Sequence, residues 1–168
     1  MDKTGGSIQA ILASGLGHKE QVARMVELAQ ADDSALAELF EILRAGRDAD
    51  RGTAAEVMKF VSKEQPERML PYIDVLIEYI DYKAPRVRWG CPEALGNLAA
   101  HYPERVGQAI PKLMENLEDP STVVRWCAAY ALAEIAKANL EKQAELVKRF
   151  DGLILTEPNS GVRNVYLK

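Results

Sequence analysis

Two tryptophans and a glutamate are the residues of this sequence best suited to holding a ligand. Trp89 and Trp126 are the only tryptophans in the chain, and Glu93 follows Trp89 by four residues. Residues four apart share one face of an α-helix, so the indole of Trp89 and the carboxylate of Glu93 are expected on the same side. Large exposed aromatic side chains act as anchors in binding sites, which makes this side a candidate contact surface.

The histidines and cysteines do not form a pattern for metal binding or catalysis. His18 and His101 lie far apart and lack His or Cys companions at the spacing of a metal site. Cys91 and Cys127 are too few for a disulfide framework, and no glycine-rich phosphate-binding motif is present. We therefore predict no metal, no cofactor and no enzymatic activity.

A repeat of 37 residues organises the chain around these side chains. Val87-Arg-Trp89 recurs as Val124-Arg-Trp126, and Ala94-Leu95 recurs as Ala131-Leu132. Self-similarity at a fixed spacing of this length marks a helical solenoid. Apolar columns that start at Leu36 continue with the same period through four copies, and neighbouring columns are three or four residues apart, which is one face of a helix.

This periodicity predicts one all-α domain over residues 1–168. First helices are expected at about 34–45, 66–81, 103–118 and 139–154, and second helices at about 48–63, 84–100, 121–138 and 159–168. Two off-period helices, at about 6–14 and 18–31, predict an N-terminal cap over residues 1–33. Pro71 and Pro111 should bend their helices. The last repeat is truncated at Lys168, so the chain either ends on a stub or is part of a longer protein.

A column of arginines recurs with the repeat and has acidic residues near it. The column and its acidic neighbours are Arg51, Arg88, Arg125, Arg163, Asp119 and Glu157. One interpretation is structural: each arginine hydrogen-bonds an acidic side chain or turn carbonyl of its own or the next unit. The other is a row of cations for phosphates. We favour the structural interpretation because an acidic partner stands at matched spacing in two units.

The pattern of Val-Arg followed by Ala-Leu at helical spacing, with prolines that bend the first helix, resembles HEAT repeats over about residues 34–168. The short bacterial and archaeal repeats of the phycobilin-lyase-subunit type are the most similar variety. The resemblance implies a right-handed α-α superhelix of about four helix pairs, whose second helices line the concave face. It also implies binding of a macromolecular partner more often than catalysis.

A helical wheel places the candidate residues on that concave face. At 100° per residue, Trp126, Tyr130 and Lys137 point away from the apolar core, with Trp89 and Glu93 in the equivalent positions and Asn97 on the flank. Small residues are expected to form a floor between the two tryptophans, namely Gly96, Ala129 and Ala133. The alternative is that each Trp packs over the neighbouring second helix and fills the inner curve.

Composition limits the partner classes. A formal charge of −4 gives no general attraction to nucleic acid or anionic membranes. No apolar run approaches the roughly 20 residues of a membrane span, and the N-terminus lacks the order of a signal peptide. We predict a cytoplasmic scaffold that presents a Trp-lined groove to a protein or peptide. Resemblance leaves two alternatives: a HEAT-like DNA-alkylation glycosylase using Trp89, Glu93 and Trp126, and a phycobilin-lyase-like subunit.

Overall fold

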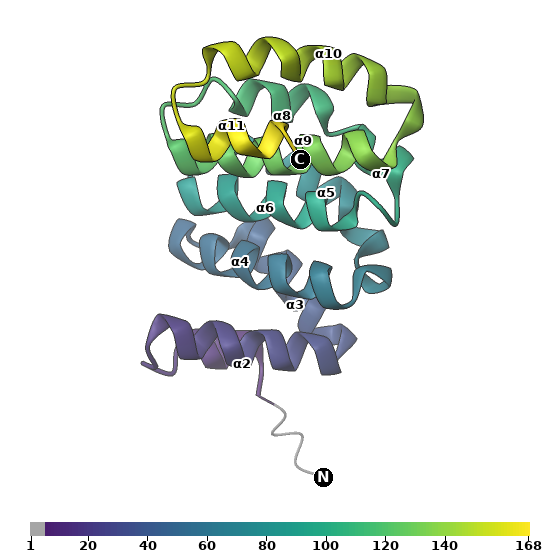
Figure 1. The fold of residues 1–168 in the computed structure, drawn as a ribbon. Helices are drawn as coiled ribbons and strands as arrows, with labels where there is room; N and C mark the ends of the chain where they lie inside the picture. Colours follow the sequence, from purple (N-terminus) through teal and green to yellow (C-terminus); the bar gives the residue numbers. More distant parts are fainter. Residues whose placement is uncertain (1–5) are drawn as a thin grey trace.

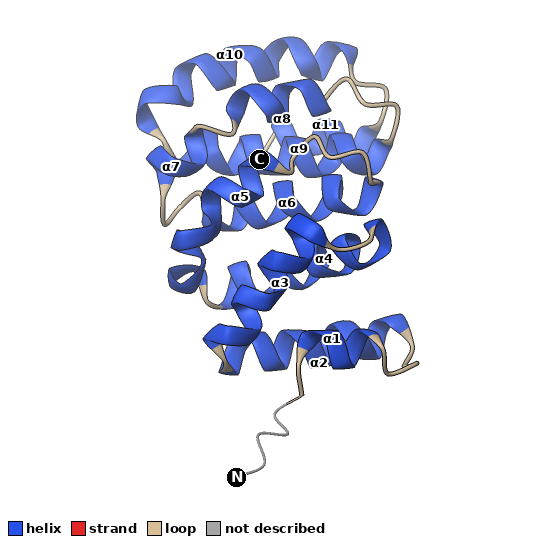
Figure 2. Cartoon of the chain, turned by 180° about the vertical axis from the view of Figure 1, so that it is seen from behind, coloured by secondary structure: helices blue, strands red, loops and turns tan. Residues whose placement is uncertain are grey.

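The computed structural model describes residues 6–168, and the first five residues of the predicted cap lie outside this range. These 163 described residues form helices joined by short turns, without strands (Figure 1). The predicted all-α solenoid is confirmed. The helices lie in two layers, with α4, α6, α9 and α11 on one side and α3, α5, α7 and α8 on the other (Figures 1 and 2).

The N-terminal end begins with a short helix packed across a longer one. Helix α1 (Ile8–Leu12) and helix α2 (His18–Ala31) are followed directly by α3 (Asp33–Ala45). Ile8 is fully buried. The carboxylate of Glu38 accepts hydrogen bonds from the backbone N–H groups of Ile8 and Gln9, at 3.0 and 2.9 Å. This carboxylate satisfies free amides at the start of α1 and fixes it against α3.

The second helices are continuous and their bounds lie close to the predicted ones. They are α4 (Asp48–Glu64), α6 (Pro85–Leu98), α9 (Thr122–Ala138) and α11 (Ser160–Tyr166). The side chains of Ser121 and Asn159 accept from the N–H groups of Val124 and Val162. These two side chains cap the N-termini of α9 and α11.

Prolines divide two of the first helices. The segment predicted as one helix at 66–81 is a 3₁₀ helix η1 (Pro66–Tyr72) followed by α5 (Ile73–Glu78). The segment predicted at 103–118 is α7 (Pro103–Gly107) followed by α8 (Ile110–Asn116). A proline ring removes one N–H donor and clashes with the carbonyl four residues earlier. The predicted bends at Pro71 and Pro111 are thus breaks. The first helices without an internal proline, α3 and α10 (Leu140–Thr156), are continuous.

The hydrophobic core lies between the two layers of helices. Small residues within it let neighbouring helices pack closely. Val57, Ala94 and Ala131, one 37-residue column, are all fully buried. At Gly90 the backbones of α4 and α6 approach so closely that an added Cβ would lie 2.7 Å from the carbonyl carbon and oxygen of Ala55. This close approach sets the distance between α4 and α6. Within residues 6–168, no helix combines the length and apolar character needed to cross a membrane.

Candidate functional site

The outward surface of α4, α6 and α9, here called the second-helix face, carries the predicted aromatic residues. Trp126 is 37% exposed, and its ring stacks on Tyr130, one turn later on the same helix, with centroids 5.6 Å apart and planes 4° apart. The stack holds the indole in one orientation, so its exposed surface is already positioned before any partner arrives.

The small-residue floor predicted between the tryptophans is not open, and this corrects the helical-wheel expectation. The ring of Tyr130 covers Gly96, where an added Cβ would lie 2.6 Å from the Tyr130 Cε1 atom. Ala129 and Ala133 are buried as well. A wheel gives the direction of a side chain but not whether a neighbour lies over it.

Asn97 joins three helices through its amide. Its Nδ2 donates to the carbonyl of Lys59 (3.0 Å) and to the hydroxyl of Ser62 (3.1 Å), both on α4. Its Oδ1 accepts from the hydroxyl of Tyr130 on α9 at 2.6 Å. Burial, with the charges of Glu134 and Glu93, raises the pKa of Tyr130 to about 12, so the phenol stays a donor. Asn97 therefore positions Tyr130, and through it Trp126, with its own amide already occupied.

Trp89 lies half-buried beside a cavity of about 240 Å³. Glu93 lines the same cavity, as predicted from the four-residue spacing, and α9 contributes Val123 and Cys127. Trp126 is therefore outside the cavity, next to its α9 wall. Among residues 6–168, Trp89 Nε1 is one of the buried polar atoms without a hydrogen-bond partner. The indole N–H is therefore enclosed by the protein and left without an acceptor.

The charges around this cavity are balanced. Glu93 pairs with Lys59 at 3.7 Å, and Glu56 pairs with Arg86 at 2.9 Å. Burial by itself would raise the pKa of Glu56, but hydrogen bonds from His18 and Arg86 lower it overall. Two acids and two bases at one cavity do not form the cationic surface that a phosphate backbone requires.

The two cysteines are free and buried. Burial raises the pKa of Cys91 to about 12, and burial together with the charge of Glu93 raises the pKa of Cys127 further. The Cys127 thiol lies 3.7 Å from Glu93 Oε1. Because the thiolate is the reactive form, both side chains serve as packing residues.

The arginines of the column lie near the start of each second helix, and their side chains reach back to the turn before it. Arg125 donates to both carboxylate oxygens of Glu157, at 3.0 and 3.1 Å, and to the carbonyls of Asp119 and Pro120, at 2.9 and 3.2 Å. One unit earlier, Arg88 contacts the Asp119 carboxylate at 2.6 Å. The guanidinium group of Arg125 therefore binds the turn before its own helix, α9, and the turn before the next second helix, α11.

Arg163 and Arg51, the two ends of the column, also bind the turn before their own helix, but they make fewer contacts. Arg163 donates to the carbonyl of Glu157 at 2.6 Å. Arg51 donates to the carbonyls of Gly46 and Leu43, at 2.6 and 3.0 Å, and its guanidinium carbon lies 4.8 Å from the ring centre of Tyr82. Lys137, on the other hand, pairs with Glu134 on its own helix at 2.8 Å and is exposed at the far end of α9.

These contacts predict how stability depends on pH. Burial alone would raise the pKa of Glu157, but the hydrogen bonds from Arg125 and from the Asn159 N–H lower it below its ordinary value of 4.5. Because the pKa of Glu157 is lower in the folded state than in the unfolded state, its carboxylate stabilises the fold at pH values above 4.5. This contribution is lost as the pH falls through the lowered folded-state pKa. We expect Glu157→Gln to be about 2 kcal/mol less stable than wild type at pH 7 and to approach it near pH 3.

Urea denaturation from pH 7 to pH 3 measures this difference, with the exposed Glu64→Gln as the control that should change little throughout. A gap between wild type and Glu157→Gln that stays constant down to pH 3 would contradict the ion-pair assignment.

Glu56 and Arg86 are among the cavity residues that were not predicted, although the repeat contained the signal for both. Glu56 precedes Glu93 by one period, and Arg86 precedes Val123 by one period. Extending the columns of Glu93 and Val123 backwards by 37 residues finds both. His18, which contacts Glu56 at 2.8 Å, comes from the off-period α2 and has no such signal.

A family model of the HEAT-like repeat matches residues 85–135, which run from α6 through α7 and α8 into α9. Over these residues the chain is similar to a HEAT-like repeat. The resemblance to HEAT repeats predicted from the sequence is confirmed by this match. Among curated proteins, no match to the sequence is found.

Several solved structures are similar in fold. A computationally designed armadillo repeat protein for modular peptide recognition has 21% identity and a TM-score of 0.71, covering 95% of this chain and 72% of its own. A designed armadillo repeat protein in complex with the peptide (KR)4 has 20% identity and a TM-score of 0.70, with 95% and 71% covered. An engineered protein has 20% identity and a TM-score of 0.67, with 96% and 82% covered. At these identities the likeness shows the fold, an α-solenoid.

Proposed function

We propose that the chain is a non-catalytic scaffold that binds a peptide or an extended segment of a partner protein on its second-helix face. The single observation that carries the proposal is the oriented, partly exposed Trp126–Tyr130 stack next to the Trp89 cavity. Aromatic side chains with fixed orientation lose little entropy on binding and are typical hot spots of interfaces.

The polar groups of the cavity suit a peptide backbone. The carboxylate of Glu93 can accept a hydrogen bond from a backbone or side-chain donor of the bound chain, and the indole of Trp89 gives the cavity an aromatic wall. Rigid helices hold these groups, because Asn97 and the close packing at Gly90 link α4, α6 and α9. Two of the similar solved structures are of repeat proteins designed for, or bound to, peptides, which adds support to this ligand class.

The buried, free cysteines support a cytoplasmic location for this scaffold, since reducing compartments keep thiols unpaired. In this proposal Trp89, Glu93, Trp126 and Tyr130 contact the partner, Lys137 extends the contact at the end of α9, and Asn97 positions Tyr130. The balanced charge of the cavity favours a protein partner over a nucleic acid.

Peptide selection tests the proposal. A random displayed library is selected on the wild-type chain, and the dissociation constants of enriched peptides are measured by fluorescence anisotropy. We expect Trp89→Ala/Trp126→Ala to weaken binding roughly 100-fold or more, since each hot-spot tryptophan contributes about 2 kcal/mol or more. Circular dichroism checks that the double variant keeps its helices. Selected peptides that bind a folded double variant as tightly as wild type would refute the proposal.

A further inference from the structure

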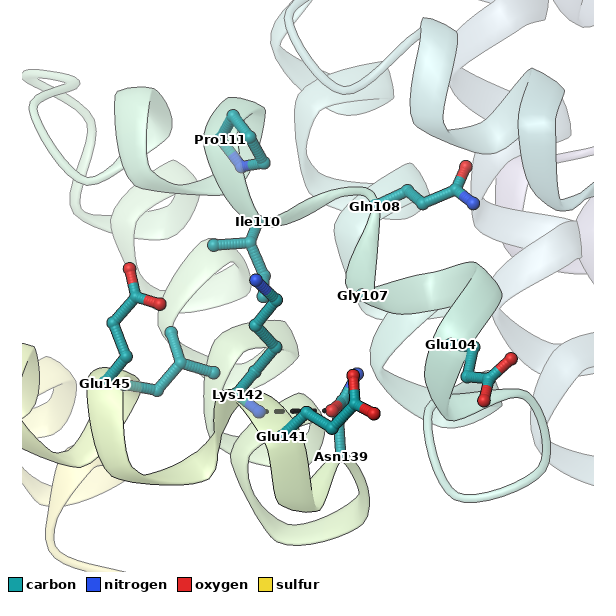
Figure 3. Close-up of a pocket in the computed structure, with 10 residues that line it drawn as sticks. Glu104, Gly107, Gln108, Ile110, Pro111, Asn139, Glu141, Lys142 and Glu145 are labelled. Carbon is teal, nitrogen blue, oxygen red and sulfur yellow. Dashed lines mark hydrogen bonds between the residues drawn. The ribbon is translucent and has the colours of Figure 1, made fainter.

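A second cavity, larger than the first, lies among the first helices. It has a volume of about 760 Å³ and is formed where the broken helix α7–α8 meets the start of α10. We call it the α7–α10 groove and define it by Glu104, Ile110, Pro111, Glu141, Glu145 and Leu146. Figure 3 shows Glu145 and Glu104 on opposite sides of the gap, with Pro111 above it and Glu141 below it, next to Asn139. A volume of this size accommodates ligands the size of a short peptide segment.

Hydrogen bonds hold the walls of the groove in place. Asn139 donates through Nδ2 to the carbonyl of Pro103 at 3.1 Å, and its Oδ1 accepts from the Lys142 N–H at 3.2 Å. The same amide lies against Gly107, where an added Cβ would be 2.8 Å from Nδ2. One side chain thus ties the start of α10 to the start of α7. The groove is a consequence of the helix break and exists before any ligand binds.

The floor of the groove is apolar and its rim is acidic. Leu146 is buried and Ile110 is half-buried, and together they form the floor. Glu104, Glu141 and Glu145 surround it, with Lys142 as the single cationic neighbour. Over residues 6–168, no side-chain hydrogen bond or ion pair is found for any of these three carboxylates. They therefore keep their charges available for a ligand.

The three carboxylates do not converge on one point. Within the described part of the chain, no group of three His, Cys, Asp or Glu side chains is placed to hold a metal ion. A ligand that neutralises them must extend along the groove and carry separated positive charges. Phosphate-bearing ligands are excluded from this surface by the same carboxylates.

We propose that the α7–α10 groove binds a basic segment of a partner protein, with one apolar side chain on the floor formed by Ile110 and Leu146. Lysine or arginine side chains on either side of that residue pair with Glu104 of α7 and with Glu141 and Glu145 of α10. This site is separate from the second-helix face, and the proposal does not depend on the function proposed for that face. The charge pattern gives the groove its specificity, and the apolar floor fixes the register of the bound segment.

The test uses a fluorescein-labelled probe peptide of sequence Lys-Arg-Leu-Lys-Arg, measured by anisotropy in 50 mM salt. We expect Glu104→Gln/Glu141→Gln/Glu145→Gln to weaken binding about tenfold or more. The matched control, Glu27→Gln/Glu64→Gln/Glu115→Gln, removes the same charge from exposed glutamates outside the groove and should change binding less than twofold. Replacing the probe's leucine by serine should weaken binding to wild type about fivefold or more.

Three outcomes would overturn the proposal. They are no binding of the probe to wild type, equal losses in the two triple variants, and equal binding of the leucine and serine probes. Trp126→Ala separates the two surfaces, because it should leave binding of this probe unchanged. If Trp126→Ala lost binding of the probe while the groove triple variant retained it, the probe would bind the second-helix face and the groove proposal would be rejected.

Discussion

Gly90→Ala is expected to destabilise the chain by about 2–3 kcal/mol, although alanine is the better helix former. The added methyl group would lie 2.7 Å from the Ala55 backbone, which no side-chain rotation can relieve. Helices α4 and α6 must then separate, and the core between them loses contact. Thermal denaturation should show a fall of roughly 5–10 °C in melting temperature.

Gly152→Ala is the matched control for this change. Gly152 also lies within a helix, α10, and an added Cβ there has nothing within 4 Å. Only the propensity gain remains, so this variant should be more stable by about 0.5–1 kcal/mol. If Gly90→Ala also proved stabilising, the close approach of α4 and α6 would be wrong.

Arg125→Ala is expected to have a still larger effect, about 3–5 kcal/mol. The side chains of Arg125 and Glu157 are only 13% and 7% exposed. Removing the guanidinium group leaves a buried carboxylate without its partner and frees the carbonyls of Asp119 and Pro120. Arg125→Lys should recover part of the loss, because an ammonium group keeps the charge but not the two-pronged geometry.

Urea denaturation at pH 7 measures the effect, with Arg44→Ala as the comparison. Arg44 pairs with Glu41 on the protein surface, where the two side chains are 45% and 68% exposed. Such pairs contribute at most about 1 kcal/mol. Equal losses in Arg125→Ala and Arg44→Ala would show that the arginine column does not hold the repeats together.

The repeat period carried most of the fold prediction. Side chains that recur every 37 residues are expected to occupy equivalent positions, and this predicted the order of the helices and most of the core. The Leu36 column fails in its last copy, where Val147 is 48% exposed. The prolines marked where the first helices bend. Whether a proline bends a helix or breaks it depends on the neighbours that replace the lost hydrogen bond, and those come from tertiary packing.

The candidate site was predicted less completely. Spacing placed Trp89 and Glu93 at the same cavity, but the depth of each side chain depends on how closely the helices pack. Between α6 and α9 that distance lets Tyr130 reach across to Asn97 and cover Gly96. A wheel drawn for one helix contains no information on its neighbour, so the expected open floor was wrong while the direction of Trp126 was right.

The most direct measurement of the central claim is the affinity of a selected peptide for wild type, Trp126→Ala and Leu155→Ala. Trp126 is 37% exposed on the second-helix face, whereas Leu155 is 86% exposed on α10, outside both proposed sites. If the peptide binds the second-helix face, its affinity should fall roughly 30-fold for Trp126→Ala and less than twofold for Leu155→Ala. Equal affinity for wild type and Trp126→Ala, or an equal loss in both variants, would contradict it.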